Sequence, residues 1–106
     1  MKLALDSVSG TTLAAVTGNA TGTAVGGDQP RSTATVVAVG TATLAGTLTI
    51  EGSLDGTVWV STGTTVALTA AATVTATSTA KGFRFYRTSL SGISGAGSCT
   101  ANMGVV

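Results

Sequence analysis

The chain has no histidine, and it has one cysteine and one proline among its 106 residues. Histidine is the commonest general base at neutral pH and the commonest metal ligand, so its absence argues against the usual hydrolytic and metal-dependent chemistries. The single cysteine, Cys99, cannot form an intrachain disulfide, and no histidine is present to activate it as a nucleophile. We therefore assign no catalytic residues, no metal ligands and no cofactor, and we predict a non-enzymatic protein without a small-molecule substrate.

Charge is also scarce, because charged residues make up 8% of the chain, against about 25% in a typical soluble domain. The net charge of +1 leaves no basic face that could neutralise several phosphates, so we do not expect a nucleic-acid partner. Thr, Ser, Gly and Ala must then cover much of the surface. Such a surface costs little to desolvate, which suits a protein that packs against neighbours.

Long hydrophobic runs are missing as well. The first ten residues, MKLALDSVSG, hold an apolar run of only residues 3–5 before Asp6, which is too short for a signal peptide. Threonines interrupt every other apolar stretch before it reaches the length of a membrane span. We therefore expect neither a signal peptide nor a membrane partner.

The residues that are plentiful favour strands. Threonine and valine are abundant, and 15 glycines divide the chain into short segments. This pattern predicts an all-β fold: a single antiparallel β-sandwich domain over residues 1–106, of jelly-roll or immunoglobulin-like type, with about eight short strands and no significant helix. The expected strand segments are residues 2–7, 12–17, 23–25, 32–39, 44–52, 57–62, 64–69, 74–79, 83–90 and 98–105.

Three local patterns refine this prediction. The segment GGDQP, residues 26–30, is expected to be a loop, because Pro30 cannot donate a hydrogen bond to a strand ladder. Residues 64–69 and 74–79 are expected to form a hairpin through the three alanines at 70–72, and threonine at every second position from 73 to 79 predicts a peripheral strand. In the last strand, Cys99 is expected to be a small apolar residue in phase with residues 101, 103 and 105.

The stretch LTIEGSLDGTVWVS, residues 48–61, is expected to be the central hairpin. Asp55 and Gly56 have the chemistry of a turn, since Asp can accept hydrogen bonds from nearby amides and Gly can adopt a positive φ. A calcium loop would need several carboxylates at alternating positions around a glycine, and only Asp55 fits that pattern.

Two registers of this hairpin are open. A four-residue loop over residues 53–56 would place Ile50 opposite Trp59, whereas a three-residue loop over residues 54–56 would place Trp59 opposite Glu51. A slip of one residue moves every side chain to the other face. We favour the first register because it buries Trp59 with Leu48 and Ile50.

The segment GFRFYRTSL, residues 82–90, carries the remaining large side chains. Alternation places Phe83 and Phe85 on one face, where they would add bulk to the core, and Arg84 and Tyr86 on the other. Arg84 is a candidate partner for Glu51, Asp55 or a neighbouring subunit. The predicted core residues are therefore Leu48, Ile50, Trp59, Phe83 and Phe85, and the candidate interface residues are Arg84, Tyr86 and Arg87.

Three segments in order, TGNATGTAV, TLTIEGSLDGTVWV and KGFRFYRTSLSGISGAGSCTANMGVV, cover the chain from about residue 17 to its end. Together they resemble small virion proteins of tailed bacteriophages, which share an early G-x-G-T-A-V turn, an EGSxDGTxW hairpin and a late RYxR strand. The central hairpin alone is also similar to discoidin-type β-sandwiches. The chain departs from the family pattern at FRFYRT, which has an extra aromatic residue, and at VGGDQPR.

The resemblance implies a capsid decoration or cement protein that stabilises the phage head by packing on neighbouring subunits. Its expected partners are the major capsid protein or other virion proteins, with a homo-oligomeric state, and its expected location is the virion, assembled in the host cytoplasm. The alternative is a module of the tail, neck or fibre that binds carbohydrate or a receptor. A third class, a small hydrolase, would need an acid/base pair among carboxylates that no motif pairs: Asp6, Asp28, Glu51 and Asp55.

Overall fold

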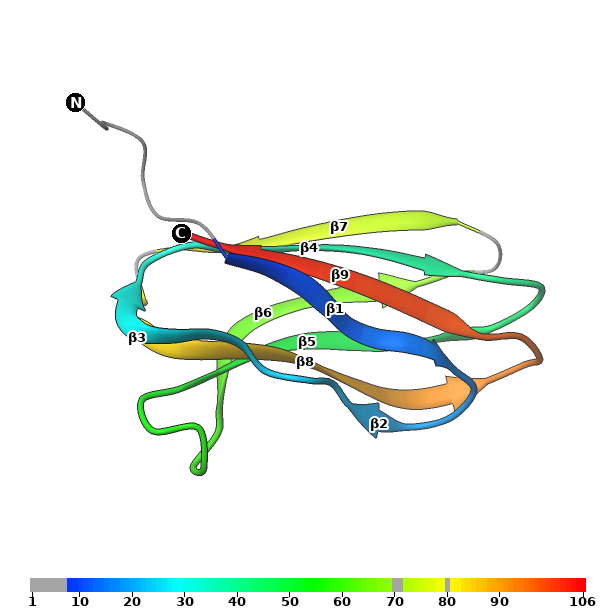
Figure 1. The fold of residues 1–106 in the computed structure, drawn as a ribbon. Helices are drawn as coiled ribbons and strands as arrows, with labels where there is room; N and C mark the ends of the chain where they lie inside the picture. Colours follow the sequence, from blue (N-terminus) through cyan, green and yellow to red (C-terminus); the bar gives the residue numbers. More distant parts are fainter. Residues whose placement is uncertain (1–7, 70–71, 80) are drawn as a thin grey trace.

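The computed structural model describes residues 8–69, 72–79 and 81–106. These residues form strands and connecting turns and contain no helix, and the strands lie in two antiparallel sheets packed face to face (Figure 1). The prediction of an all-β sandwich is confirmed. The strands are β1 Val8–Val16, β2 Ala20–Thr21, β3 Val25–Arg31, β4 Ala34–Gly40, β5 Ala45–Ser53, β6 Val60–Leu68, β7 Thr73–Ser78, β8 Phe83–Ser94 and β9 Cys99–Val105.

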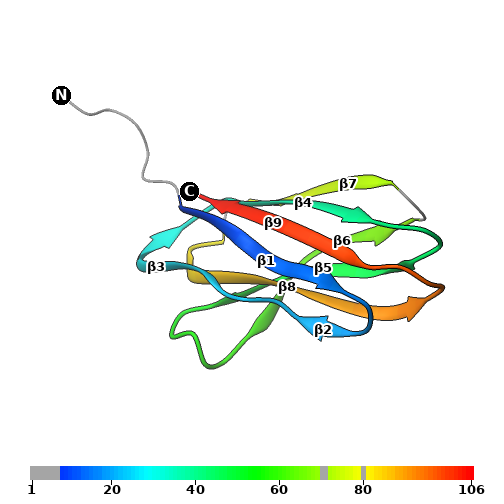
Figure 2. The same cartoon turned by 45° about the vertical axis from the view of Figure 1, so that its right-hand side comes forward.

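The strand order is that of a jelly roll. One sheet has the order β1-β9-β4-β7, and the other has the order β2-β8-β5-β6, with β3 also paired to β8. Because β2 and β3 pair with successive parts of β8, they act as one interrupted strand, and each sheet then has four strand positions. The last strand lies beside the first, and the chain passes repeatedly from one layer to the other (Figures 1 and 2).

The hydrophobic core lies between the two sheets, and small side chains fill much of it. Every second residue of β4 and β9 points inward, so both strands show the period of two expected for a sheet with one buried face. Cys99 is fully buried at the start of β9, in phase with the other inward residues of that strand, as predicted. Leu48 and Ile50 of β5 face these residues from the other sheet and are 1% exposed.

The strand β7 lies at the edge of the first sheet, which confirms the prediction of a peripheral strand. Its threonines point outward, while Val74, Ala76 and Ser78 point inward. The predicted hairpin between residues 64–69 and 74–79 is wrong, because β6 belongs to one sheet and β7 pairs with β4 in the other. The small inward residues of β7 instead pack across the core, so this connection crosses between the layers.

Two further segments differ from the prediction. The expected loop at residues 26–30 lies within β3, which pairs with β8 through an irregular register between Gly26 and Arg31 that accommodates Pro30. The expected strands at 57–62 and 64–69 are replaced by one strand, β6, which begins at Val60 and has a register shift against β5 around Gly63, whose φ is 86°. The predicted strand at residues 2–7 lies outside the described residues.

Candidate functional site

The loop between β5 and β6 is held by two short side chains. Asp55 Oδ1 accepts hydrogen bonds from the amides of Thr57 at 2.8 Å and Val58 at 2.9 Å. Ser53 Oγ accepts the amide of Gly56 at 2.8 Å and donates to Asp55 Oδ1 at 3.0 Å. Gly56 has a φ of 80°, a conformation that glycine adopts readily. The amides of Val58 and Thr57 and the Ser53 hydroxyl hold the pKa of Asp55 below its ordinary value.

This loop is longer than either register that the sequence left open. Gly52 pairs with Val60 and Glu51 with Ser61, so the six residues from Leu54 to Trp59 connect the strands. The favoured pairing of Ile50 with Trp59 is therefore wrong. Because Asp55 binds amides two and three residues further along the chain, it draws the backbone into a wider turn than a tight hairpin.

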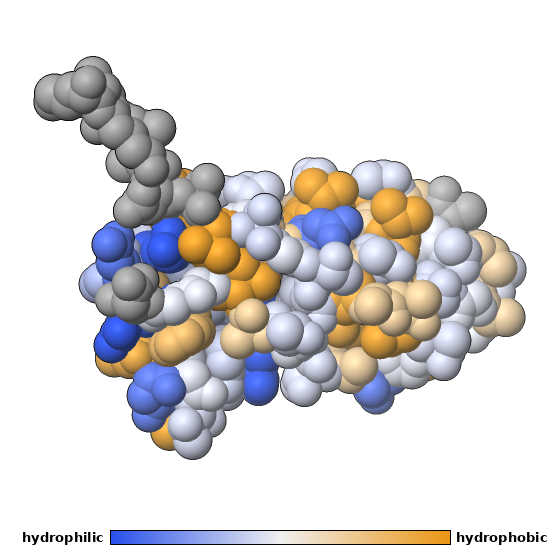
Figure 3. All heavy atoms as spheres, in the orientation of Figure 1, coloured by the Kyte–Doolittle hydropathy of each residue, from blue (hydrophilic) through white to orange (hydrophobic). Residues whose placement is uncertain are grey.

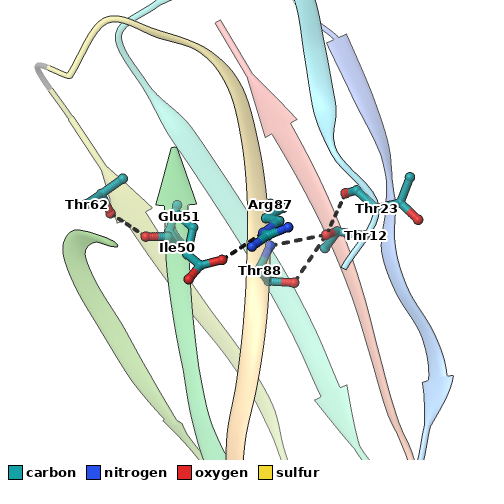
Figure 4. Close-up of polar contacts among 7 residues, drawn as sticks. All are labelled: Thr12, Thr23, Ile50, Glu51, Thr62, Arg87 and Thr88. Atoms are coloured by element: carbon teal, nitrogen blue, oxygen red, sulfur yellow. Dashed lines mark hydrogen bonds and ion pairs between the residues drawn. The ribbon is translucent and has the colours of Figure 1, made fainter. Parts of the chain in front are cut away.

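Trp59 lies outside the core, contrary to the prediction, and stacks on a charged pair at the surface of the second sheet. The guanidinium carbon of Arg87 lies 4.2 Å from the centre of the Trp59 ring. Arg87 Nε donates to Glu51 Oε1 at 2.7 Å, and the two residues face each other on β8 and β5 (Figure 4). The structure thus brings Trp59, Arg87 and Glu51 together, whereas Arg84 Nε donates to the carbonyl of Gly27 at 3.3 Å.

The inward face of β8 is the opposite of the predicted one. Tyr86 was expected at an interface but is fully buried, and its hydroxyl donates to the carbonyl of Arg31. Burial raises the pKa of the Tyr86 phenol. Phe83 is partly buried and meets the Tyr86 ring edge-on, with the ring centres 6.0 Å apart, whereas Phe85 is outside the core. The sequence contained the relevant signal. Phe85 lies on the same face of the strand as the charged Arg87, which favours the outer face, whereas Tyr86 lies on the same face as Leu90, which favours the inner face.

An apolar pocket that the sequence reasoning missed lies at the base of the β5–β6 loop. Its volume is about 220 Å³. Three side chains around it are among the most exposed large apolar groups: Leu54 at 63%, Val58 at 66% and Val60 at 48%. The remaining lining residues are Ser53, Asp55 and Phe83.

The buried hydroxyl groups of Thr12, Thr62 and Thr88 have structural partners elsewhere in the fold. Thr12 Oγ1 donates to the carbonyl of Thr23 at 2.9 Å and accepts from the amide and hydroxyl of Thr88, which joins β1 to β8 across the sandwich (Figure 4). Thr62 Oγ1 donates to the carbonyl of Ile50 at 2.8 Å. These hydroxyls satisfy backbone groups and each other, which is consistent with their burial.

The carboxylates and the thiol do not assemble into a reactive site among the described residues. Glu51 is paired with Arg87, and Asp55 is part of the turn. Asp6 and the side chain of Asp28 lie outside what the structure describes. Burial raises the pKa of the Cys99 thiol, which disfavours the reactive thiolate. Within the described residues, no group of three or more potential metal ligands occurs, and no helix is long and apolar enough to cross a membrane.

The outer face of the first sheet has a distinctive surface. None of its four strands contains Asp, Glu, Lys or Arg. Val37 and Val39 are 41% and 42% exposed near its middle. Their neighbours across the strands form the outward rows Thr77–Thr35–Gly104, Thr75–Val37–Asn102 and Thr73–Val39–Thr100. We call this surface the neutral face.

Hydrogen bonds between side chains order the neutral face. Thr35 Oγ1 and Thr77 Oγ1 lie 3.2 Å apart, and Thr11 Oγ1 donates to Asn102 Oδ1 at 2.8 Å. In the view of Figure 3, apolar and near-neutral residues cover much of the right-hand part, and strongly hydrophilic residues gather toward the left-hand end. The described charged residues all lie in or beside the strands of the second sheet.

Comparisons of the chain with protein-family models, with curated proteins and with solved structures find no match. The resemblance to virion proteins of tailed bacteriophages therefore stays a prediction from the sequence.

Proposed function

We propose that this chain is a non-enzymatic structural subunit of a tailed-bacteriophage virion, a decoration or cement protein that packs on neighbouring capsid subunits. The observation that carries the proposal is the neutral face, a sheet surface built without charged residues. Charged side chains must lose much of their hydration when a surface is covered, whereas threonine and valine lose little. A face of this composition is suited to being covered by another protein.

The exposed valines give this contact a favourable energy. About two-fifths of the surface of Val37 and of Val39 is exposed, and covering this exposed part would contribute roughly 1 kcal/mol for each residue. The threonine and asparagine side chains around them supply hydroxyl and amide groups for hydrogen bonds to a partner backbone.

The fold and the sequence support the same proposal. Jelly rolls build viral capsid domains as well as lectin domains, which is an analogy at the level of the fold. The sequence resemblance to phage virion proteins points to the capsid rather than to a free enzyme. The partner under this proposal is the major capsid protein or another virion protein, and the location is the virion.

A binding assay tests the proposal. Purified protein is added to virus particles that lack it, and bound protein is measured after sedimentation of the particles. Lysine at Val37 or Val39 should weaken binding about tenfold or more, because it places a charge within the contact. Thr65→Lys is the control, since Thr65 is exposed on β6 of the other sheet. Equal binding of Val37→Lys, Val39→Lys and wild type would refute a role for the neutral face.

The second candidate function, carbohydrate binding by a tail or fibre module, rests on Trp59. Its ring is partly exposed, and Arg87 covers one of its faces, while the Glu51 carboxylate lies close by. An aromatic ring beside polar groups can stack on a sugar ring. Calorimetry with a panel of host-surface glycans tests this candidate: binding that Trp59→Ala abolishes would support it, and the absence of heat with every glycan would refute it.

A further inference from the structure

The two sheets have four edges, and three of them carry features that obstruct pairing with another strand. The edge strand β1 has register shifts after Thr11 and Leu13, and Ala15 has a φ of 49°. The edge strand β6 has a register shift around Gly63, which has a φ of 86°. On the remaining edge of the second sheet, β2 has two residues, and β3 contains Pro30 and an irregular register. Bulges, short strands and proline are established means of preventing edge-to-edge association.

The fourth edge, β7, has none of these features. Its six residues from Thr73 to Ser78 pair with β4 in an unbroken register from Ala34 to Val39. The sequence TVTATS contains no charge, no proline and no glycine. In an antiparallel ladder, alternate residues of an edge strand direct their amide and carbonyl groups away from the neighbouring strand. The β7 edge therefore offers a regular row of backbone donors and acceptors.

We propose that β7 pairs antiparallel with β7 of a second copy of this chain, across a two-fold axis perpendicular to the sheet. This inference rests on the proposed function and deepens it, because it names the edge through which subunits associate. The sheet β1-β9-β4-β7 of one copy would then continue into the same sheet of the other copy, and the two neutral faces would form one surface. The absence of charge makes the edge self-complementary, since two identical strands can approach without repulsion.

The side chains favour a second copy over an unrelated strand. A two-fold axis perpendicular to the sheet places outward residues opposite outward residues, so it passes through a residue position. Thr75 and Ala76 are the positions that pair most of the six-residue strand. In the first case Thr75 faces Thr75 of the partner copy, and in the second it faces Thr77 of the partner copy. Either register forms threonine pairs across the interface, the same type of pair that Thr35 and Thr77 form within the sheet at 3.2 Å.

Sedimentation velocity over a range of concentrations tests this proposal. A six-residue edge makes a small interface, so we expect a dimer of twice the 10.2 kDa chain mass, with an affinity of about micromolar. Thr75→Lys should weaken dimerisation more than about tenfold, because in either register it places two like charges at or next to the axis. Ser9→Lys should leave it unchanged, since Ser9 puts the same charge on β1, at the other edge of the same sheet.

A charge-swap experiment keeps the test decisive if one variant is poorly folded. Thr75→Glu alone should also be monomeric, and an equimolar mixture of Thr75→Lys and Thr75→Glu should form the dimer again. Hydrogen exchange of the segment 72–79 should slow as the wild-type concentration rises. A wild-type monomer at every concentration would overturn the proposal, and so would a Thr75→Lys dimer as strong as wild type or an equal loss in Ser9→Lys.

These outcomes distinguish a failure of the β7 pairing from a failure of the proposed function. A protein that is monomeric but still coats virus particles overturns the β7 pairing and leaves the proposed function standing. A β7 dimer that binds no particle supports the pairing and contradicts the proposed function. Protection of β7 that appears only after a different protein is added assigns the edge to that protein and overturns the second copy.

Discussion

Gly52→Ala should destabilise the protein by a predictable amount, because the space beside Gly52 is filled by an aromatic ring. A Cβ atom at this buried position would lie 2.5 Å from Cγ and 2.8 Å from Cε2 of Phe83, whereas ordinary contacts are 3.4–4 Å. Moving the ring away would disturb its packing against Tyr86, since the two ring planes meet at 84° with their centres 6.0 Å apart. Overpacking of this kind costs about 1–3 kcal/mol, and replacing glycine in a strand returns about 0.5–1 kcal/mol.

The difference of these two terms is about 0–2.5 kcal/mol, and its middle, about 1 kcal/mol, corresponds to a Tm lower by roughly 4–8 °C for a chain of this size. Circular dichroism during thermal unfolding measures it. Gly104→Ala is the matched control, because a Cβ atom at Gly104 in β9 would meet nothing within 4 Å. In a Phe83→Ala background, Gly52→Ala should cost little or nothing. An undiminished Tm for Gly52→Ala, or the same loss in both backgrounds, would refute the packing explanation.

Three further predictions concern the loop and the second sheet. The folded protein lowers the pKa of Asp55, so the stabilisation from its ionised carboxylate is complete above the ordinary pKa of 3.8 and disappears as the pH falls through the lowered value. NMR of the loop amides during an acid titration measures this pH dependence, and Asp55→Asn should abolish the dependence. Arg87→Ala should change stability by at most about 1 kcal/mol but alter Trp59 fluorescence, because it uncovers one face of the ring. Tyr86→Phe should lower the free energy of unfolding by about 1–2 kcal/mol in denaturant titrations, because the carbonyl of Arg31 loses its buried donor.

The sequence was sufficient to predict the fold class and several strands, because the period of two is a local property. Threonines at 73, 75 and 77 predicted a peripheral strand, and β7 is an edge strand. The phase of Cys99 in the last strand also agrees with its burial. What the local pattern does not contain is the strand order, so β6 and β7 were assigned to one hairpin although they lie in opposite sheets.

The site was less predictable, because it depends on side chains that reach beyond their own strand. Asp55 binds the amides of Thr57 and Val58, which lengthens the turn and moves Trp59 from the core to the surface. Its stacking partner, Arg87, comes from β8, and no pattern within the hairpin indicates that contact. The inward position of Tyr86 could have been found, since the phase of Leu90 and Arg87 shows which face of β8 is buried.

The most direct test of the central claim is a cryo-EM reconstruction of intact virus particles from a host that produces this chain. We expect regularly arranged copies on the particle, with the neutral face formed by β1, β9, β4 and β7 covered by neighbouring subunits. Particles that lack the chain, or that carry it with the neutral face open to solvent, would contradict the account.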